Sequence, residues 1–161
     1  MIVNRQHSIR IAAKDLNQFV VRARRALRLP SESISICLVS NSEMERWNRA
    51  YRGKKGPTDV LSFPADANKG PRVRKNSRSR RDADLFLIAP HSNGRWRYLG
   101  DIAIAPAVAK RNALRFRRTF REEMRILILH GMLHLMGYDH ETDTGQMDRR
   151  ERRLRRELGL D

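Results

Sequence analysis

The stretch from Thr119 to His140, TFREEMRILILHGMLHLMGYDH, decides how this chain folds. Thr119 and Glu122 have the spacing of a capping box, which predicts the start of a helix. Residues 124–136 are apolar on almost every side of that helix, as expected for a helix at the centre of a core. Gly137 can adopt a left-handed conformation and is predicted to end it. We therefore expect one central buried helix over 119–136.

The rest of the chain predicts a single domain around that helix, since 161 residues suit one core. Hydrophobic periodicity and capping signals predict four more helices, over residues 14–27, 40–51, 106–113 and 143–158. Four short apolar runs predict strands, over residues 2–6, 33–39, 60–63 and 99–105.

The segment 65–98 is too long for an ordinary connection between two strands. Its first half contains NKGPRVRKNSRSRRDAD, which is basic and nearly without apolar residues, and we expect it to be disordered. The run 85–89 is apolar enough for a hairpin strand, but one short run does not decide this.

The formal net charge is +16 and the isoelectric point is about 11.4, so the surface should attract polyanions, with nucleic acid the natural partner. The alternative is that the charge serves solubility alone. Basic residues concentrate in two segments, 69–97 and 149–156, which predicts two basic surfaces.

Cys37 is the only cysteine, which excludes an internal disulfide and fits a reducing compartment. The N-terminus lacks the apolar centre of a signal peptide, and no segment has eighteen uncharged apolar residues. The sequence therefore predicts a cytoplasmic protein with no membrane partner.

Three histidines form the pattern HxxxHxxGxxH at His130, His134 and His140. Two histidines four residues apart share one face of a helix, and the turn at Gly137 lets the third approach the same point. Three imidazoles suit Zn²⁺ and leave a fourth position open for water. A single histidine in an apolar helix is more often a hydrogen-bonded core residue, but the three together favour a metal. His7 and His91 have no such pattern.

Metzincin proteases share this spacing but carry a glutamate, their general base, directly after the first histidine. Here Gly131 stands in that place. A metalloprotease is therefore disfavoured, and the chemistry should act on another substrate.

The segment 130–140 also matches HGxLHLxGYDH, the signature of the YbeY endoribonucleases, at every specified position. The segments YRGK (51–54), PTDVLSFP (57–64) and LGDI (99–102) resemble the same family and occur in the same order. The resemblance covers most of the chain but not the segment 65–98, where the family usually has a shorter connection.

The resemblance implies an α/β (α+β) fold, with one compact domain over 1–161 and a small mixed sheet packed with about five helices. It places one Zn²⁺ per chain on His130, His134 and His140, with the metal site on the central helix. It further implies cleavage of single-stranded RNA, not DNA, in ribosomal RNA maturation and ribosome quality control, with the small ribosomal subunit as partner.

Zinc can activate a water for phosphodiester hydrolysis, although an RNA 2′-hydroxyl could be the nucleophile instead. The resemblance places Arg52 at the active site, where a guanidinium would stabilise phosphate charge. Lys54 and Lys55 are candidates for attracting phosphates. Asp101 and Asp139 are candidates for orienting a ligand imidazole.

The main alternative function is a ribosome-associated RNA-binding factor whose zinc is structural. In such a protein an Asp or Glu from elsewhere in the chain would close the fourth position.

Overall fold

A computed structural model describes residues 1–65, 98–139 and 143–160. The elements in chain order are β1 (Ile2–Asn4), α1 (Ala13–Ala26), β2 (Ile34–Leu38), α2 (Asn41–Trp47), the π-helical turn η1 (Asn48–Arg52), β3 (Val60–Pro64), β4 (Gly100–Ile104), α3 (Pro106–Arg115), α4 (Phe120–Leu135) and α5 (Gln146–Leu158). The predicted fold class, a small mixed sheet with five α-helices, is confirmed. The segment 66–97 lies outside the described residues, and with it the expected disorder and hairpin strand.

The sheet has the strand order β1-β2-β4-β3. β1, β2 and β4 run parallel, with Ile2 opposite Ile36 and Ile36 opposite Ile102, whereas β3 runs antiparallel to β4. All five residues of β2 and of β4 are buried, as is usual for central strands covered on both faces. At the end of the β3–β4 pair, a Cβ on Gly100 would lie 2.1 Å from the carbonyl oxygen of Phe63, so this close approach requires glycine.

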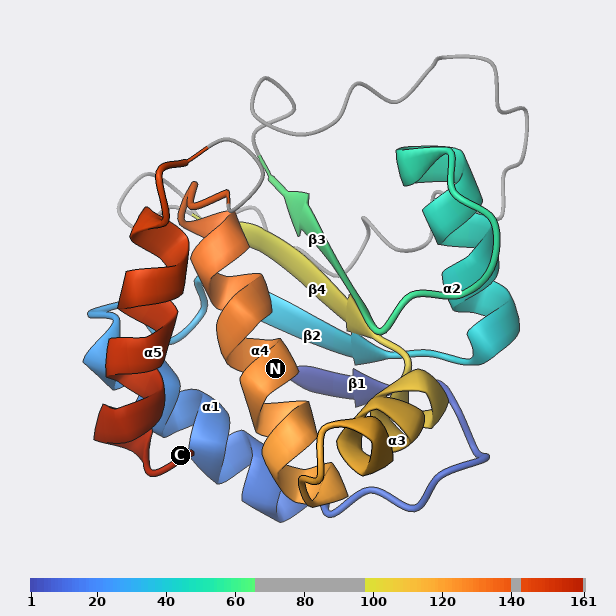
Figure 1. Cartoon of the computed structure of the whole chain (residues 1–161), viewed down its shortest axis with the longest axis horizontal. Helices are drawn as coiled ribbons and strands as arrows, with labels where there is room; N and C mark the ends of the chain where they lie inside the picture. Colours follow the sequence, from blue (N-terminus) through green and yellow to red (C-terminus); the bar gives the residue numbers. More distant parts are fainter. Residues whose placement is uncertain (66–97, 140–142, 161) are drawn as a thin grey trace.

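The two faces of the sheet are covered by different helices. Ile34, Ile36 and Ile102 point to the face where the main core forms with α1, α4 and α5. Cys37 and Ala103 point to the other face, which packs against Met44 and Trp47 of α2 and other residues. Figure 1 shows α4 lying across the sheet, with α1 and α5 beside it.

Helix α4 is the central helix predicted from the sequence. Both capping-box hydrogen bonds between Thr119 and Glu122 are present, and Gly137 has a φ of 93° directly after the C-cap. Arg121 and Arg125 of α4 both bond to Asp15 of α1, and these arginines hold the pKa of Asp15 below its usual value. None of the helices in the described ranges is long and apolar enough to cross a membrane.

Candidate metal centre

Two of the three predicted ligands, His130 and His134, lie on the same face near the end of α4. Their Nε2 atoms are 3.1 Å apart, and the ring planes are inclined at 74°. The His130 side chain is 26% exposed, so the pair is accessible from the surface although the residues around it in α4 are buried. The helix thus presents two imidazole nitrogens to one point.

A buried carboxylate from α5 contacts Nδ1 of His130, the ring nitrogen that does not face His134. Glu151 Oε2 lies 2.9 Å from His130 Nδ1, and the other carboxylate oxygen accepts a hydrogen bond from Arg155. Burial alone would raise the pKa of Glu151, but His130 and Arg155 together keep that pKa below its usual value. Because a carboxylate only accepts, His130 donates to Glu151 from Nδ1, and in the neutral imidazole the lone pair then lies on Nε2, the atom that faces His134.

The donor chemistry of this pair fits zinc. Two nitrogens that share a tetrahedral zinc at about 2.0–2.1 Å are separated by roughly 3.3 Å, close to the observed 3.1 Å between the two Nε2 atoms. An imidazole whose second nitrogen is bound to a carboxylate is the common arrangement for a zinc ligand. The third predicted ligand, His140, lies outside the described residues, and within the described ranges no group of three potential ligands is present. The three-histidine site therefore stays a prediction that the described pair supports.

The position after the first histidine has no room for a side chain. A Cβ on Gly131 would lie 2.7 Å from Cγ2 of the fully buried Ile102 in β4. Gly131 also accepts a hydrogen bond through its carbonyl from Ser62 of β3. A glutamate base of the metzincin type would have to enter this contact between α4 and the sheet, which gives a structural reason for the glycine.

Arg52 is the last residue of η1, and Lys54 and Lys55 follow it in an exposed loop. The turn is packed onto the sheet through Tyr51, whose ring centroid lies 4.8 Å from that of Phe63 in β3. Gly53, with a φ of 67°, ends the turn. The turn and α4 thus both contact β3, and the roles given to the three basic residues stay predictions.

The two aspartates proposed to orient a ligand occupy different positions. Asp101 is buried in β4 and accepts a 2.6 Å hydrogen bond from the Tyr98 hydroxyl, while burial raises its pKa. Asp139 follows the end of α4, and its carbonyl accepts a hydrogen bond from the Asp143 amide. The carboxylate that the structure places on His130 is that of Glu151. The one signal in the sequence is its spacing, because Glu151 shares the buried face of α5 with Met147, Leu154 and Leu158, but that spacing does not name its partner.

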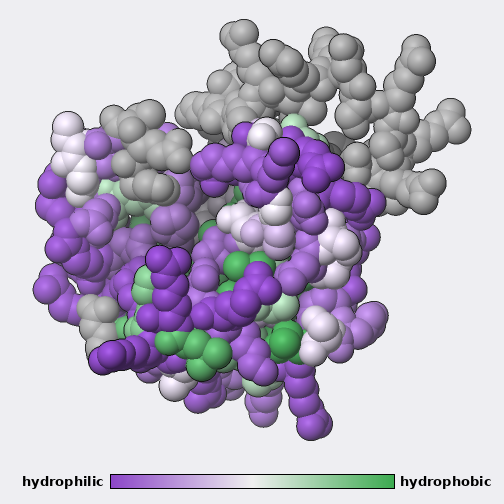
Figure 2. Space-filling view, turned by 45° about the vertical axis from the view of Figure 1, so that its right-hand side comes forward, coloured by the Kyte–Doolittle hydropathy of each residue, from purple (hydrophilic) through white to green (hydrophobic). Residues whose placement is uncertain are grey.

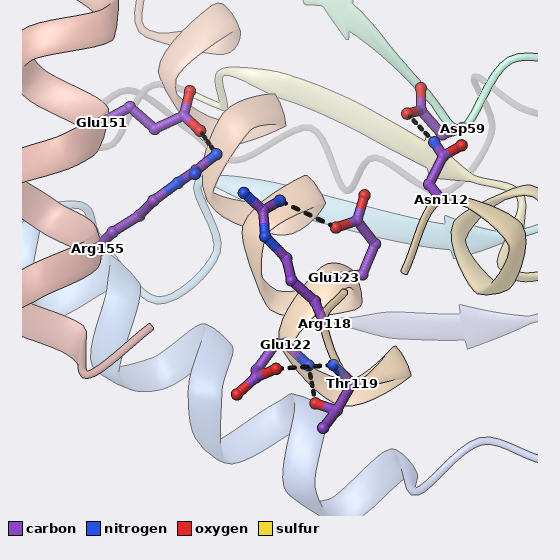
Figure 3. Close-up of polar contacts among 8 residues, drawn as sticks. All are labelled: Asp59, Asn112, Arg118, Thr119, Glu122, Glu123, Glu151 and Arg155. Carbon is purple, nitrogen blue, oxygen red and sulfur yellow. Dashed lines mark hydrogen bonds and ion pairs between the residues drawn. The ribbon is translucent and has the colours of Figure 1, made fainter. Parts of the chain in front are cut away.

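A cavity of about 320 Å³ extends from His130 along α4 towards the start of the helix. Its walls come from β3, the end of α3, α4 and α5, and its lining residues are Asp59, Val60, Phe116, Arg118, Glu123, Ile126, Leu127, His130, Glu151 and Arg155. Figure 3 shows two ion pairs along it, Glu151 with Arg155 and Glu123 with Arg118, and the hydrogen bond that Asn112 donates to Asp59. The cavity therefore joins the candidate metal centre to a charged surface region.

Comparison with known proteins identifies relatives over nearly the whole chain. The model of the family described as endoribonuclease YbeY matches residues 1–159. The endoribonuclease YbeY of Koribacter versatilis is 34% identical over 160 residues, which cover 99% of this chain and 86% of the relative. That of Roseiflexus sp. is 38% identical over 130 residues, covering 79% and 71% of the two chains.

One solved structure supports the fold. The solution structure of TM1509 from Thermotoga maritima superposes with a TM-score of 0.58 at 24% sequence identity and covers 98% of this chain and 89% of that one. Similarity at this identity concerns the fold alone, whereas the family model and the curated relatives concern the sequence itself. By that sequence match, the chain is a member of the endoribonuclease YbeY family.

Proposed function

We propose that this protein is a zinc-dependent endoribonuclease that cleaves single-stranded RNA during ribosomal RNA maturation and ribosome quality control in the cytoplasm. The observation that carries the proposal is the His130–His134 pair, with Nε2 atoms 3.1 Å apart and one ring held by a buried glutamate. The relatives named endoribonuclease YbeY give the class of reaction.

His130 and His134, together with His140 from the sequence pattern, would hold the metal. A zinc ion bound there would supply an activated water and polarise a phosphoryl oxygen. The chain itself prepares the ligands: Glu151 fixes the proton of His130 on Nδ1, and Arg155 fixes Glu151.

The basic residues near β3 would act on the RNA. Arg52 is an exposed residue, and a guanidinium can pair two phosphate oxygens at once, which would stabilise the charge that develops during cleavage. Lys54 and Lys55 would add less directional attraction for the backbone. The net charge of +16 would speed the approach of RNA and make binding sensitive to salt.

The test is the substitution His134→Ala, because two remaining imidazoles cannot hold an open tetrahedral site. We expect the variant to lose both its zinc and its cleavage of single-stranded ribosomal RNA fragments. Zinc per chain is measured by elemental analysis after dialysis, and cleavage is measured on gels with and without chelator. His7→Ala, at an exposed histidine outside the pattern, is the matched control and should keep both.

Two results would contradict the proposal. A His134→Ala variant with one zinc per chain and full cleavage would show that His134 is not a ligand. A wild-type protein that binds zinc and RNA but cleaves no RNA would favour the alternative, a ribosome-associated factor with a structural zinc.

A further inference from the structure

An aromatic side chain is exposed at the end of the cavity away from His130. Phe116 is 50% exposed and lines the cavity together with Arg118 and Glu123. It follows α3 as the C-cap, and the next residue, Arg117, has a φ of 54°, which is uncommon for a residue other than glycine. The turn is closed by hydrogen bonds from the amides of residues 116, 117 and 118 to carbonyls of α3. The ring is therefore presented on a well-defined turn.

Two arginines lie over this ring in cation–π geometry. The guanidinium carbon of Arg118 lies 5.3 Å from the ring centroid and that of Arg115 lies 5.6 Å from it. Arg118 is held in place by a 3.2 Å ion pair with Glu123, which is only 2% exposed. Arg115 is exposed to solvent, and a base that stacks on the ring would take the place of its guanidinium. An exposed aromatic ring combined with arginine side chains is the arrangement by which proteins bind unpaired nucleotides, through base stacking and cation–π contacts.

Phe116 and His130 of the candidate metal centre line the same cavity. Glu123, Leu127 and His130 lie on one stripe of α4, and seven residues of helix span about 10 Å. A volume of about 320 Å³ is at the lower end for small-ligand pockets, which run from about 300 to 1,000 Å³. A volume of this size can hold a single unpaired nucleotide.

We infer that Phe116 stacks against an unpaired base of the RNA substrate, close to the bond presented to the histidines, with Arg115 and Arg118 beside the backbone. This inference rests on the proposed function, because it assigns a binding site for that substrate. It explains single-strand preference physically: a base that is paired and stacked within a duplex has no free face for the ring.

The experiment asks whether the loss of the Phe116 ring and the loss of one RNA base weaken binding through the same contact. Binding is measured by fluorescence anisotropy for a short unstructured RNA and for a series in which one nucleotide at a time lacks its base. We expect Phe116→Ala and Phe116→Leu to weaken binding of the intact RNA by roughly 5- to 150-fold, the range expected when one base no longer stacks. Phe116→Tyr should bind like wild type. Removal of the base at one position should weaken wild type by a similar factor and leave Phe116→Ala unchanged.

The controls separate stacking from other effects. Leu114 is 75% exposed on the same helix and does not line the cavity, so Leu114→Ala should bind like wild type. Annealing the RNA to its complement should abolish the difference between wild type and Phe116→Ala. The inference is overturned if Phe116→Ala binds the single strand as wild type does, if Phe116→Leu retains full affinity, or if no position of the RNA couples to the ring.

Cleavage of the same RNAs, measured in parallel, distinguishes this inference from the proposed function. A protein whose binding depends on Phe116 but which never cleaves RNA would contradict the proposed function and keep the stacking site. A protein that cleaves RNA but whose binding does not depend on Phe116 would contradict the stacking site and keep the proposed function.

Discussion

Glu151 shows why a single residue of the candidate site is hard to find from the sequence. Met147, Leu154 and Leu158 are spaced to share one face of a helix, and all three are buried in α5. Glu151 lies on the same face, but a glutamate in an arginine-rich helix resembles a surface residue until its partner is known. That partner, His130, is 21 residues earlier in the chain, and only the packing of α4 against α5 brings the two together.

The substitution Glu151→Gln tests this contact. The amide keeps the shape of the side chain but loses the charge that holds the His130 proton, so we expect zinc affinity to fall by about 10- to 100-fold. Affinity is measured by competition with a zinc-binding dye. Glu157→Gln, at an exposed position on the same helix, should not change it. Equal zinc affinity in wild type and Glu151→Gln would show that the contact is structural only.

The substitution Arg52→Ala tests the predicted role of the arginine. We expect turnover of single-stranded RNA to fall roughly 100-fold, the cost of removing one donor to transition-state charge, with zinc content and melting temperature unchanged. Arg52→Lys should restore only part of the rate, because an ammonium does not form the bidentate pair. Arg49→Ala, on the same turn, is the control. A higher KM with unchanged kcat would mean that Arg52 only binds RNA.

At the scale of helices and strands, local signals predicted most of the fold. Both capping boxes, at Ser40 with Glu43 and at Thr119 with Glu122, start helices in the structure. The first helix was expected over residues 14–27 and is found at Ala13–Ala26, with Leu27 as its C-cap. The helix expected over 40–51 changes to a π-helical turn at Asn48, where Tyr51 packs against Phe63 of β3, and Gly53 ends this turn.

The close contact between Gly131 of α4 and Ile102 of β4 can be tested by substitution. Gly131→Ala places a Cβ against Ile102, so we expect the free energy of unfolding to fall by about 1–3 kcal/mol, although alanine favours helix formation. Chemical denaturation measures this decrease. In a double-mutant cycle, Ile102→Ala removes the atoms in conflict, and the two changes together should cost less than their sum. Strict additivity would mean that the helix shifts and that the contact is not tight.

For the whole molecule, the sequence predicted one domain and a basic surface. The order of the strands in the sheet could not be predicted from the sequence and is known only from the structure. The pattern of apolar residues within a strand predicts which residues are buried, but it does not predict which strand lies next to it. The parallel pairing of β1 with β2 was therefore not predictable from the sequence pattern. Most of the face in Figure 2 is hydrophilic, in accord with the expected charge. The joint use of α3, α4 and α5 in one cavity is likewise a property of the assembled chain.

We predict that the basic residues within the segment 65–98 contribute to RNA binding. Residues 69–81 contain seven lysines and arginines, and their deletion should weaken RNA binding. The salt dependence of binding should become shallower by about 0.7 for each RNA phosphate that these side chains neutralise in the wild-type protein. Zinc content and melting temperature should stay the same. Binding of single-stranded RNA across a salt series measures the slope.

A variant with those seven residues changed to glutamine keeps the length of the segment and should behave like the deletion. An unchanged slope would contradict the electrostatic role. Lower turnover or stability at every salt concentration would instead mean that the segment forms part of the active-site groove.

The pairing of β3 with β4 has a consequence for how the chain tolerates change in length. Its end is fixed by the hydrogen bond from the Ala65 amide to the Leu99 carbonyl, at 2.8 Å, and by the fit of Gly100 against Phe63. Once two ends are held this way, the entropy of closing a flexible loop grows only with the logarithm of its length, about 0.6 kcal/mol for each doubling. A flexible tether inserted between Ala65 and Leu99 should therefore cost little folding free energy and leave the histidines on α4 in place.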